Sequence, residues 1–404
     1  MPADNRVQSW KLFAAKSIRG FGIGLIVVSF PTYLSFLGIS PLEIGALFSV
    51  VMIGTTFLLF LISYRVRNLG RRASLFLFTA VVSIAAAGVA AGDSFLLLLP
   101  FAFFANFSLG GSDTSVFLPI EQSLLPGYVA GEQRNRVFAI YNTSGYLAVA
   151  LGVLSSSLFY TSFGGGLPGF RGILLIYIAC LLVNAAIYST IPGIGRKREA
   201  ANLLDFSSLS RRSRSIVREL SLLFAVDAFA GGLVLQSVMA YWFHLRFNAS
   251  LDSLSDVFAA VNLIIAISIM LTPVIARRIG VVRTMVFTHL PSNILLLLIA
   301  FAPTYAVAVL VLLMRQSISQ MDVPTRQSYV MAVTSPEERP QAAAITGMGR
   351  SIATSSSPWL SGAMLQYAAL GLPFIFGGVM KSVYDLVLLW RFDKVKPPEE
   401  SGAD

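Results

Sequence analysis

Charged side chains interrupt several long apolar stretches of this chain. The segment MDVPTRQSY (321–329) follows the apolar run VAVLVLLM (307–314), and it places Asp322 four residues before Arg326. On a helix, that spacing puts the carboxylate and the guanidinium on one face, where they can pair. A charge inside a membrane-spanning helix is costly, so each such residue is a candidate functional residue.

One group of these charges lies near one end of the apolar stretches, and we expect it to gate a central cavity. Ion pairs among its members would hold that end closed and would break when it opens; static pairs that bond nearby helix ends are the alternative. Asp113 or Asp227 could instead carry a transported proton, because burial disfavours the charged form of a carboxylate. The group comprises Arg19, Asp113, Glu121, Asp227, Asp322 and Arg326.

A second group of charges lies deeper in the apolar stretches. At about 1.5 Å of rise per residue, Arg315 and Arg350 fall near the middle of their stretches. Neither has an evident acid at the same depth, whereas Lys381 is followed one turn later by Asp385. An arginine binds a carboxylate through two parallel hydrogen bonds, so these two residues favour an anionic substrate. Alternatively, Arg315 bonds backbone carbonyls or reaches Asp322.

Neutral polar residues complete the candidate substrate site. Asn106, Asn142 and Gln236 could line a cavity, although a hydrogen bond between helices is an equally good account of each. The two histidines, His244 and His289, are too far apart in sequence to suggest a metal site. The sequence therefore predicts no metal, no cofactor and no catalytic residue.

The composition indicates what kind of protein carries these residues. Of the 404 residues, 55% are hydrophobic and 12% are charged, and the mean hydropathy is +0.74. A soluble domain carries about 25% charged residues. Apolar runs of about 20 residues, the length that crosses a bilayer as a helix, recur along the chain, so we predict an all-α integral membrane protein with twelve transmembrane helices. The predicted spans are 17–38, 41–63, 72–92, 95–126, 132–160, 168–191, 217–246, 250–276, 281–302, 304–333, 337–367 and 369–392.

The basic residues are distributed unevenly among the loops between these spans. The formal net charge is +10. With a cytoplasmic N-terminus, most Lys and Arg residues fall in cytoplasmic segments, whereas the external loops hold Arg171 and Arg246. Cytoplasmic loops of membrane proteins carry an excess of Lys and Arg, so we predict a multi-pass protein of the cell membrane with both termini in the cytoplasm. The charge needs no nucleic-acid partner to explain it.

The longest predicted cytoplasmic loop divides the chain almost in half. Its sequence, GIGRKREAANLLDFSSLSRRSRS, is basic and rich in serine. This composition is typical of a solvated linker with some affinity for anionic lipid headgroups; a regulatory or partner-binding role is the alternative. The predicted domains are an N-terminal six-helix bundle (1–191), a linker (192–216), a C-terminal six-helix bundle (217–392) and a cytoplasmic tail (393–404).

The two halves resemble each other in sequence. LPIEQS and VPTRQS align proline with proline and Glu121 with Arg326, and we expect each proline to bend its helix because it removes one backbone hydrogen bond. RGFGIGLIV and DAFAGGLVL align Arg19 with Asp227. We expect the aligned charges to lie opposite each other. Parallel repeats of six helices are a known transporter plan, with the substrate site between the halves.

The loop after the second span carries the most specific resemblance to a known family. It reads YRVRNLGRR, which resembles the Asp-Arg-x-Gly-Arg-Arg motif of the major facilitator superfamily. Gly70, Arg71 and Arg72 match that motif, and Arg67 stands where the family usually has its aspartate. The second-half copy, ARRIGVVR, keeps Gly280 and also lacks the acid. The resemblance implies two pseudo-symmetric six-helix bundles, with this loop helping to lock the outward-open state.

The resemblance also implies a function, namely secondary transport by alternating access. NFSLGG in the fourth span has Asn106 where a family pattern has arginine, and GYLAVALGVLSSS in the fifth lacks the Gly-Pro of drug–proton antiporters. Both departures count against a standard drug–proton antiporter. We therefore predict secondary active transport of a small organic solute, with an anionic or carboxylate-bearing substrate favoured. The carboxylates within the spans allow coupling to H+.

Other functions remain as alternatives to this prediction. One is multidrug-type efflux of hydrophobic compounds, and another is a membrane sensor or scaffold that uses the same fold without transport. An intramembrane enzyme is disfavoured, because Tyr384-Asp385 has no partner motif of an aspartyl protease and the chain has no Walker-type nucleotide loop. Membrane lipid and a small-molecule substrate are the expected partners, and the resemblance implies a monomer.

Overall fold

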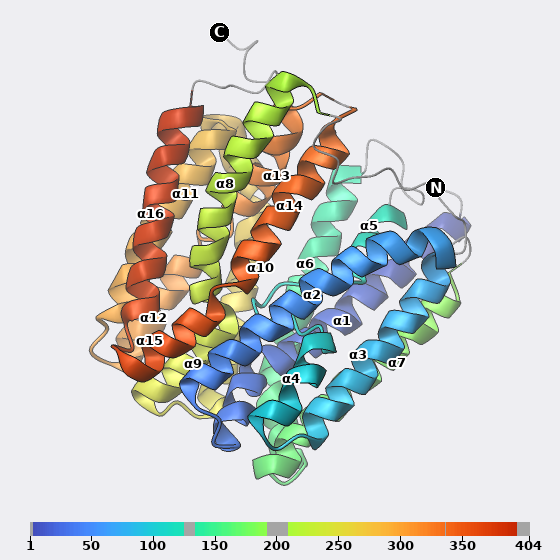
Figure 1. Cartoon of the computed structure of the whole chain (residues 1–404), viewed down its shortest axis with the longest axis vertical. Helices are drawn as coiled ribbons and strands as arrows, with labels where there is room; N and C mark the ends of the chain where they lie inside the picture. Colours follow the sequence, from blue (N-terminus) through green and yellow to red (C-terminus); the bar gives the residue numbers. More distant parts are fainter. Residues whose placement is uncertain (1–2, 125–133, 192–208, 336, 394–404) are drawn as a thin grey trace. The chain divides into compact units, whose positions relative to one another are not determined.

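The computed structural model describes residues 3–124, 134–191, 209–335 and 337–393, and within these ranges the chain forms sixteen α-helices (Figure 1). Within these ranges there is no β-strand, and the all-α prediction is confirmed. The helices fall into two compact units. One comprises residues 1–199 and 235–263, and the other comprises residues 200–234 and 264–404.

The first unit contains seven helices from the N-terminal part of the chain and a later segment. Residues 235–263 pack with this unit although they lie in the predicted second bundle. Its helices are α1 (Ala3–Phe36), α2 (Pro41–Leu69), α3 (Arg71–Ala91), α4 (Phe95–Phe104), α5 (Leu118–Leu124), α6 (Arg134–Ser162), α7 (Gly166–Ser189), α9 (Gln236–Phe247) and the first part of α10 (Leu251–Ile279).

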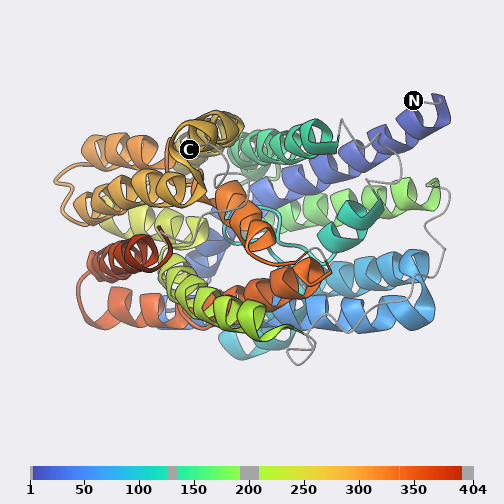
Figure 2. The same ribbon diagram turned by 90° about the horizontal axis from the view of Figure 1, so that it is seen from above.

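The second unit contains the remaining helices and the rest of α10. In it, α8 packs against α14 and against α16 (Figure 2). Its helices are α8 (Arg211–Leu233), α11 (Val281–Ala300), α12 (Tyr305–Gln316), α13 (Asp322–Ala332), α14 (Arg339–Ser355), α15 (Pro358–Tyr367) and α16 (Leu372–Phe392).

Nine segments of the described chain are helical, long and apolar enough to cross a membrane. They match nine of the predicted spans. The other three predicted spans, 95–126, 304–333 and 337–367, each consist of two shorter helices, and the matching span 217–246 is also divided, between α8 and α9. A broken helix exposes backbone groups, and these are tolerated at membrane depth only where protein or a water-filled cavity surrounds them.

The break between α4 and α5 has a local cause. Asn106 and Gly111 have φ angles of 51° and 76°, and this left-handed conformation ends a right-handed helix. Pro119 and Pro324 were predicted to bend a continuous helix by removing a hydrogen bond, and this is wrong. Each proline lies in the first turn of a new helix, α5 or α13, where a missing N–H removes no hydrogen bond.

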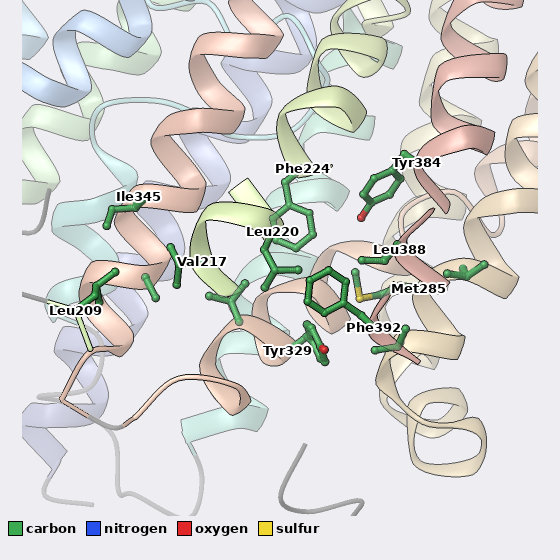
Figure 3. Packing of buried hydrophobic residues seen from close by; sticks show 14 residues of the cluster. Leu209, Val217, Leu220, Phe224, Met285, Tyr329, Ile345, Tyr384, Leu388 and Phe392 are labelled. Carbon is green, nitrogen blue, oxygen red and sulfur yellow. The ribbon is translucent and has the colours of Figure 1, made fainter. Parts of the chain in front are cut away.

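A hydrophobic cluster fills the second unit between α8, α11, α13, α14 and α16 (Figure 3). Phe224 of α8 and Tyr384 of α16 meet there with their ring centroids 6.4 Å apart. In the first unit, glycines allow α1 and α6 to approach closely: a Cβ on Gly24 would come within 2.2 Å of the Val149 carbonyl oxygen. Small residues at helix contacts are typical of packing in membranes.

The start of α8 is fixed to the turn before α14 by one carboxylate. Glu338 accepts hydrogen bonds from the Ser210 backbone N–H and the Ser213 hydroxyl, each at 2.5 Å, and from the Ser335 hydroxyl at 2.9 Å. These donors stabilise the charged carboxylate and lower the pKa of Glu338 to about 2. The last residues of the predicted linker (192–216) therefore form the start of α8 and are anchored within the second unit.

Two single-residue joints have the same geometry in the two parts of the chain. Gly70 alone separates α2 from α3, with φ at 79°, and Gly280 alone separates α10 from α11, with φ at 87°. Each glycine carbonyl accepts the backbone N–H four residues on, from Ser74 or Thr284, at 3.1 and 3.0 Å. The repeat inferred from the sequence is thus present in the backbone.

We predict that alanine at either joint lowers stability, because the conformation of Gly70 (φ 79°, ψ 160°) and Gly280 (φ 87°, ψ 162°) is essentially restricted to glycine, and any other residue there costs about 1–3 kcal/mol. Gly70→Ala and Gly280→Ala should each lower the melting temperature of the detergent-solubilised protein. Gly347→Ala is the control, since a Cβ at this position in α14 meets nothing within 4 Å and alanine favours the helix. Melting temperatures that are equal for all three variants would contradict the prediction.

Candidate functional site

Arg19 is the centre of a buried ion cluster in the first unit. From α1, its guanidinium donates to both carboxylate oxygens of Glu121 on α5, at 2.8 and 2.6 Å. Asp113 lies 2.7 Å from the same guanidinium and accepts from Lys16 at 2.9 Å. Two cations therefore balance two carboxylates in this cluster.

Tyrosines complete the shell around Glu121. The hydroxyls of Tyr141 on α6 and Tyr188 on α7 both donate to its carboxylate, and Tyr188 also accepts from Arg19 at 2.8 Å. The break between α4 and α5 positions Asp113, whose Oδ1 accepts the backbone N–H of Ser115 at 3.0 Å. Four helices and one unwound segment thus meet at this cluster.

Asp227 is the centre of a second cluster, in the second unit. From α8, its carboxylate accepts from Lys381 of α16 at 2.6 Å and from Arg350 of α14 at 2.9 Å. Arg326 of α13 lies 3.5 Å away. Arg326 also bonds Asp322 at 2.5 Å, four residues earlier, which confirms the pair expected from the spacing.

Sequence reasoning missed a buried histidine beside this cluster. His289 on α11 lies with its Nδ1 2.9 Å from Asp385 Oδ1 on α16, and Asn293 donates to the same carboxylate at 2.8 Å. The available signal was the spacing of His289 and Asn293, four residues apart in an apolar helix. That spacing places both side chains on one face.

Arg315 differs from the other buried cations. In the described part of the chain, its guanidinium makes one hydrogen bond, from Nη1 to the neighbouring Gln316 Oε1 at 3.1 Å, and its buried Nε has no acceptor. No salt bridge to it occurs there. Arg350, by contrast, bonds Asp227, so the expectation that both arginines lack an acid is wrong for Arg350.

Two of the uncharged residues predicted to line a substrate cavity, Asn106 and Gln236, lie in or against the unwound segment 105–117. Asn106 is buried, and neither polar atom of its side chain has a partner among the described residues. Gln236, at the start of α9, packs so closely on Gly111 that a Cβ there would lie 1.7 Å from its Oε1, while its Nε2 is unbonded. Asn142 is partly buried on α6.

The predicted gate residues fall into two sets, one in each unit. Arg19, predicted to lie opposite Asp227, binds Asp113 and Glu121; Glu121, predicted to lie opposite Arg326, binds Arg19. Sequence alignment of the halves located the charged positions but not their bonded partners. A gating role for these residues stays a prediction.

One arginine of the loop motif bonds the end of a neighbouring helix. Arg72 donates to the carbonyl of Ser189, the last residue of α7, at 2.9 Å, and Lys11 donates to Thr190 at 2.9 Å. Cations stabilise the negative end of a helix dipole. The side chain of Arg67 lies outside the described residues. Arg71 follows Gly70 as the first residue of α3.

Comparison with known proteins agrees with the fold. A curated relative, the uncharacterized membrane protein YJR124C of Saccharomyces cerevisiae, is 22% identical over 94% of this chain and 93% of its own. The multidrug efflux protein YfmO of Bacillus subtilis is also 22% identical, over 94% and 92%. Among solved structures, the human organic anion transporter MFSD10 superposes with a TM-score of 0.67 at 19% identity, covering 96% of this chain and 100% of that one.

The family itself is shown by a match along nearly the whole sequence. The sequence model of the Major Facilitator Superfamily matches residues 12–314 and, in a second overlapping match, 220–404. The two matches agree with the repeated joints at Gly70 and Gly280 and with the membrane-spanning helices. The chain is a multi-pass membrane protein that belongs to the Major Facilitator Superfamily of transporters.

Proposed function

We propose that this protein carries a small organic anion across the cell membrane by alternating access, with Arg315 as the charged contact of the substrate. The observation that supports the anion is the bonding of the buried cations. Lys16, Arg19, Arg326 and Lys381 are all buried and all bind carboxylates. Arg315 is 6% exposed and has no carboxylate partner among the described residues.

A buried guanidinium without an anion leaves desolvated donors unpaired. Leaving a buried charged donor unsatisfied costs more than a neutral one, and Arg315 has an unbonded Nε. A substrate carboxylate could accept from two guanidinium nitrogens at once. The competing structural role is stabilisation of the end of α12, since Arg315 lies in its last turn and a cation there meets the negative end of the helix dipole.

The remaining parts of the proposal follow from the family plan. The six-helix halves 1–191 and 217–392 would rock about a central substrate site. Asn106, Asn142 and Gln236 would supply uncharged contacts to the substrate, and Arg350 would supply a cation that it shares with Asp227. The two ion clusters would rearrange as gates. We place both termini in the cytoplasm and take the monomer as the working unit. The human structural neighbour is described as an organic anion transporter, which is consistent with the proposal.

Arg315→Gln tests the proposed anion contact. We expect benzoate, succinate or citrate to raise the melting temperature of the wild-type protein, because a ligand that binds the native state stabilises it. Loss of a charge-assisted hydrogen bond costs about 1.5–3 kcal/mol, so the variant should bind the same anion about 10- to 100-fold more weakly. Uptake of that anion into proteoliposomes should fall in parallel.

Arg391→Gln is the matched control for this experiment. Arg391 pairs with Glu219, and its side chain is 57% exposed, so its replacement should leave anion affinity unchanged. Equal affinity of wild type and Arg315→Gln for the stabilising anion would show that Arg315 is structural. Binding without flux under any gradient would indicate a sensor on the transporter fold.

Multidrug-type efflux is the second candidate, and the likeness to the Bacillus subtilis multidrug efflux protein favours it. The same thermal assay separates the two functions. Stabilisation by tetraphenylphosphonium but by none of the three anions, with no effect of Arg315→Gln, would support efflux of hydrophobic cations. Stabilisation by an anion that depends on Arg315 would support the first proposal.

A further inference from the structure

His289 lies between two carboxylates in the interior of the second unit. The residue is 3% exposed. Its Nδ1 is 2.9 Å from Asp385 Oδ1 and 3.1 Å from Oδ2, and its Nε2 is 3.8 Å from Asp227 Oδ1. Both ring nitrogens therefore face an acid, one within hydrogen-bond distance and one just beyond it.

The bond to Asp385 selects one tautomer of the ring when that carboxyl group is ionised. An ionised carboxylate can only accept a hydrogen bond, so Nδ1 then carries the hydrogen that lies between it and Asp385. In the neutral imidazole, Nε2 then holds a lone pair on the side of Asp227. A proton added at Nε2 would be placed between the ring and a second carboxylate, which is a favourable position for an imidazolium.

The two carboxylates have very different partners. Asp227 already binds Lys381, Arg350 and Arg326. Asp385 bonds only the His289 ring and the amide of Asn293 among the described residues. Lys381 lies one turn away on the same helix, but its ammonium donates to Asp227. Asp385 is thus a buried carboxylate without a cation at hydrogen-bond distance while His289 is neutral.

The charges on all elements around the ring give a simple balance. α8 contributes Asp227, α13 contributes Asp322 and Arg326, α14 contributes Arg350, and α16 contributes Lys381, Asp385 and the uncharged Tyr384, whose ring lies 6.1 Å from the imidazole. α12, which also packs against α11, contributes Arg315, whose charge the substrate anion of the proposed function would offset. Apart from Arg315, and with neutral His289, three carboxylates face three cations. One further proton on His289 would therefore be the charge that changes in this cluster.

We propose that His289 and Asp385 form a proton-binding site that couples transport to H+. A proton from solution adds to the Nε2 lone pair, no covalent bond to a heavy atom breaks, and the cluster gains one positive charge. The imidazolium then donates from Nδ1 to Asp385 and from Nε2 toward Asp227. This site deepens the proposed function and rests on it for the substrate: an anion bound at Arg315 brings one negative charge, so anion and proton together leave the net charge of the loaded carrier unchanged.

Nitrogen NMR of the histidine rings tests the proton site without any substrate. The chain has two histidines, and His244→Gln removes the other one, which lies at the end of α9 and contacts the Ala249 carbonyl. In ¹⁵N-histidine-labelled protein, we expect the His289 signals to change from those of imidazole to those of imidazolium between pH 9 and pH 5. Asp385→Asn should lower the imidazolium-to-imidazole ratio roughly tenfold at a given pH, since a charge-assisted bond is lost. Ring signals that stay constant over this range would overturn the proposal.

Proton uptake on anion binding tests the coupling. When benzoate is added to wild-type protein in weakly buffered detergent solution, we expect a pH-indicator dye to report protons taken up, and we expect His289→Asn to abolish that uptake. Benzoate binding with no proton uptake by the wild type would refute the coupling. Absence of benzoate binding, with a His289 ring that titrates by NMR, would instead contradict the proposed substrate class and support the proton site.

Discussion

Replacement of Arg19 by methionine is expected to lower the free energy of unfolding by about 3–5 kcal/mol, the cost of breaking a buried ion pair by removing one partner. Asp113 would keep Lys16, at 2.9 Å. Among the described residues, Glu121 would keep only two tyrosine hydroxyls as side-chain donors. The substitution therefore leaves a buried carboxylate without a cation, while methionine preserves most of the apolar length of the arginine.

A double-mutant cycle distinguishes the loss of the ion pair from a loss of packing. Arg19→Met with Glu121→Gln restores one cation and one carboxylate, so most of the stability should return in thermal unfolding of the solubilised protein. Arg391→Met is the surface control, because an exposed pair such as Arg391–Glu219 contributes about 0–1 kcal/mol. If Arg19→Met unfolds at the same temperature as Arg391→Met, the buried cluster has no special role in stability.

The helices that cross the membrane in one piece could be predicted from the sequence because their signal is local. Apolar runs such as 281–302 differ from the described helix, α11, by a few residues at one end. The joints at Gly70 and Gly280 could also be predicted from the sequence, since a glycine with basic neighbours between two apolar runs has few other structural explanations. In both cases the physical cause lies within about 30 residues of sequence.

Helix breaks were harder to predict because apolar composition continues through them. Between α8 and α9, the break falls at Val234 and Leu235, which carry no polar or proline signal. The segment 105–117 did carry one, in its glycines and its polar residues, but hydropathy averaged over a whole span hides it. A broken helix is stabilised by contacts from other helices, such as the Leu109 carbonyl that accepts the Ser237 N–H at 3.0 Å, and these are not local in sequence.

Ion-pair partners were the least predictable feature of the candidate site. Alignment of the halves related Arg19 to Asp227 by position, but a bonded pair depends on which helices pack side by side. Arg350 and Lys381 bond Asp227 although each lies more than 120 residues away from it in the sequence. His289 was overlooked for the same reason, since its partners on α8 and α16 approach it only in the folded chain.

The second cluster allows a prediction that joins stability to the proposed proton site. Asp227→Asn is expected to cost about 3–5 kcal/mol, because Lys381, Arg350 and Arg326 would lose the carboxylate that they share. Adding Lys381→Met restores the balance of charge, with two arginines against Asp322 and Asp385, and should recover much of the melting temperature. A double variant that is no more stable than Asp227→Asn would show that charge balance does not govern this cluster.

Lys381→Met alone completes the cycle and gives the opposite imbalance. Three carboxylates then face two arginines, and the charge that can restore neutrality is a proton on His289. We therefore expect this variant to unfold closer to wild type than Asp227→Asn does, and to hold more imidazolium at a given pH in the nitrogen spectrum, because a buried excess of negative charge favours the protonated ring. A loss of stability as large as that of Asp227→Asn, with an unchanged His289 signal, would mean that the imidazole does not exchange a proton with its surroundings and serves only as a hydrogen-bond donor to Asp385.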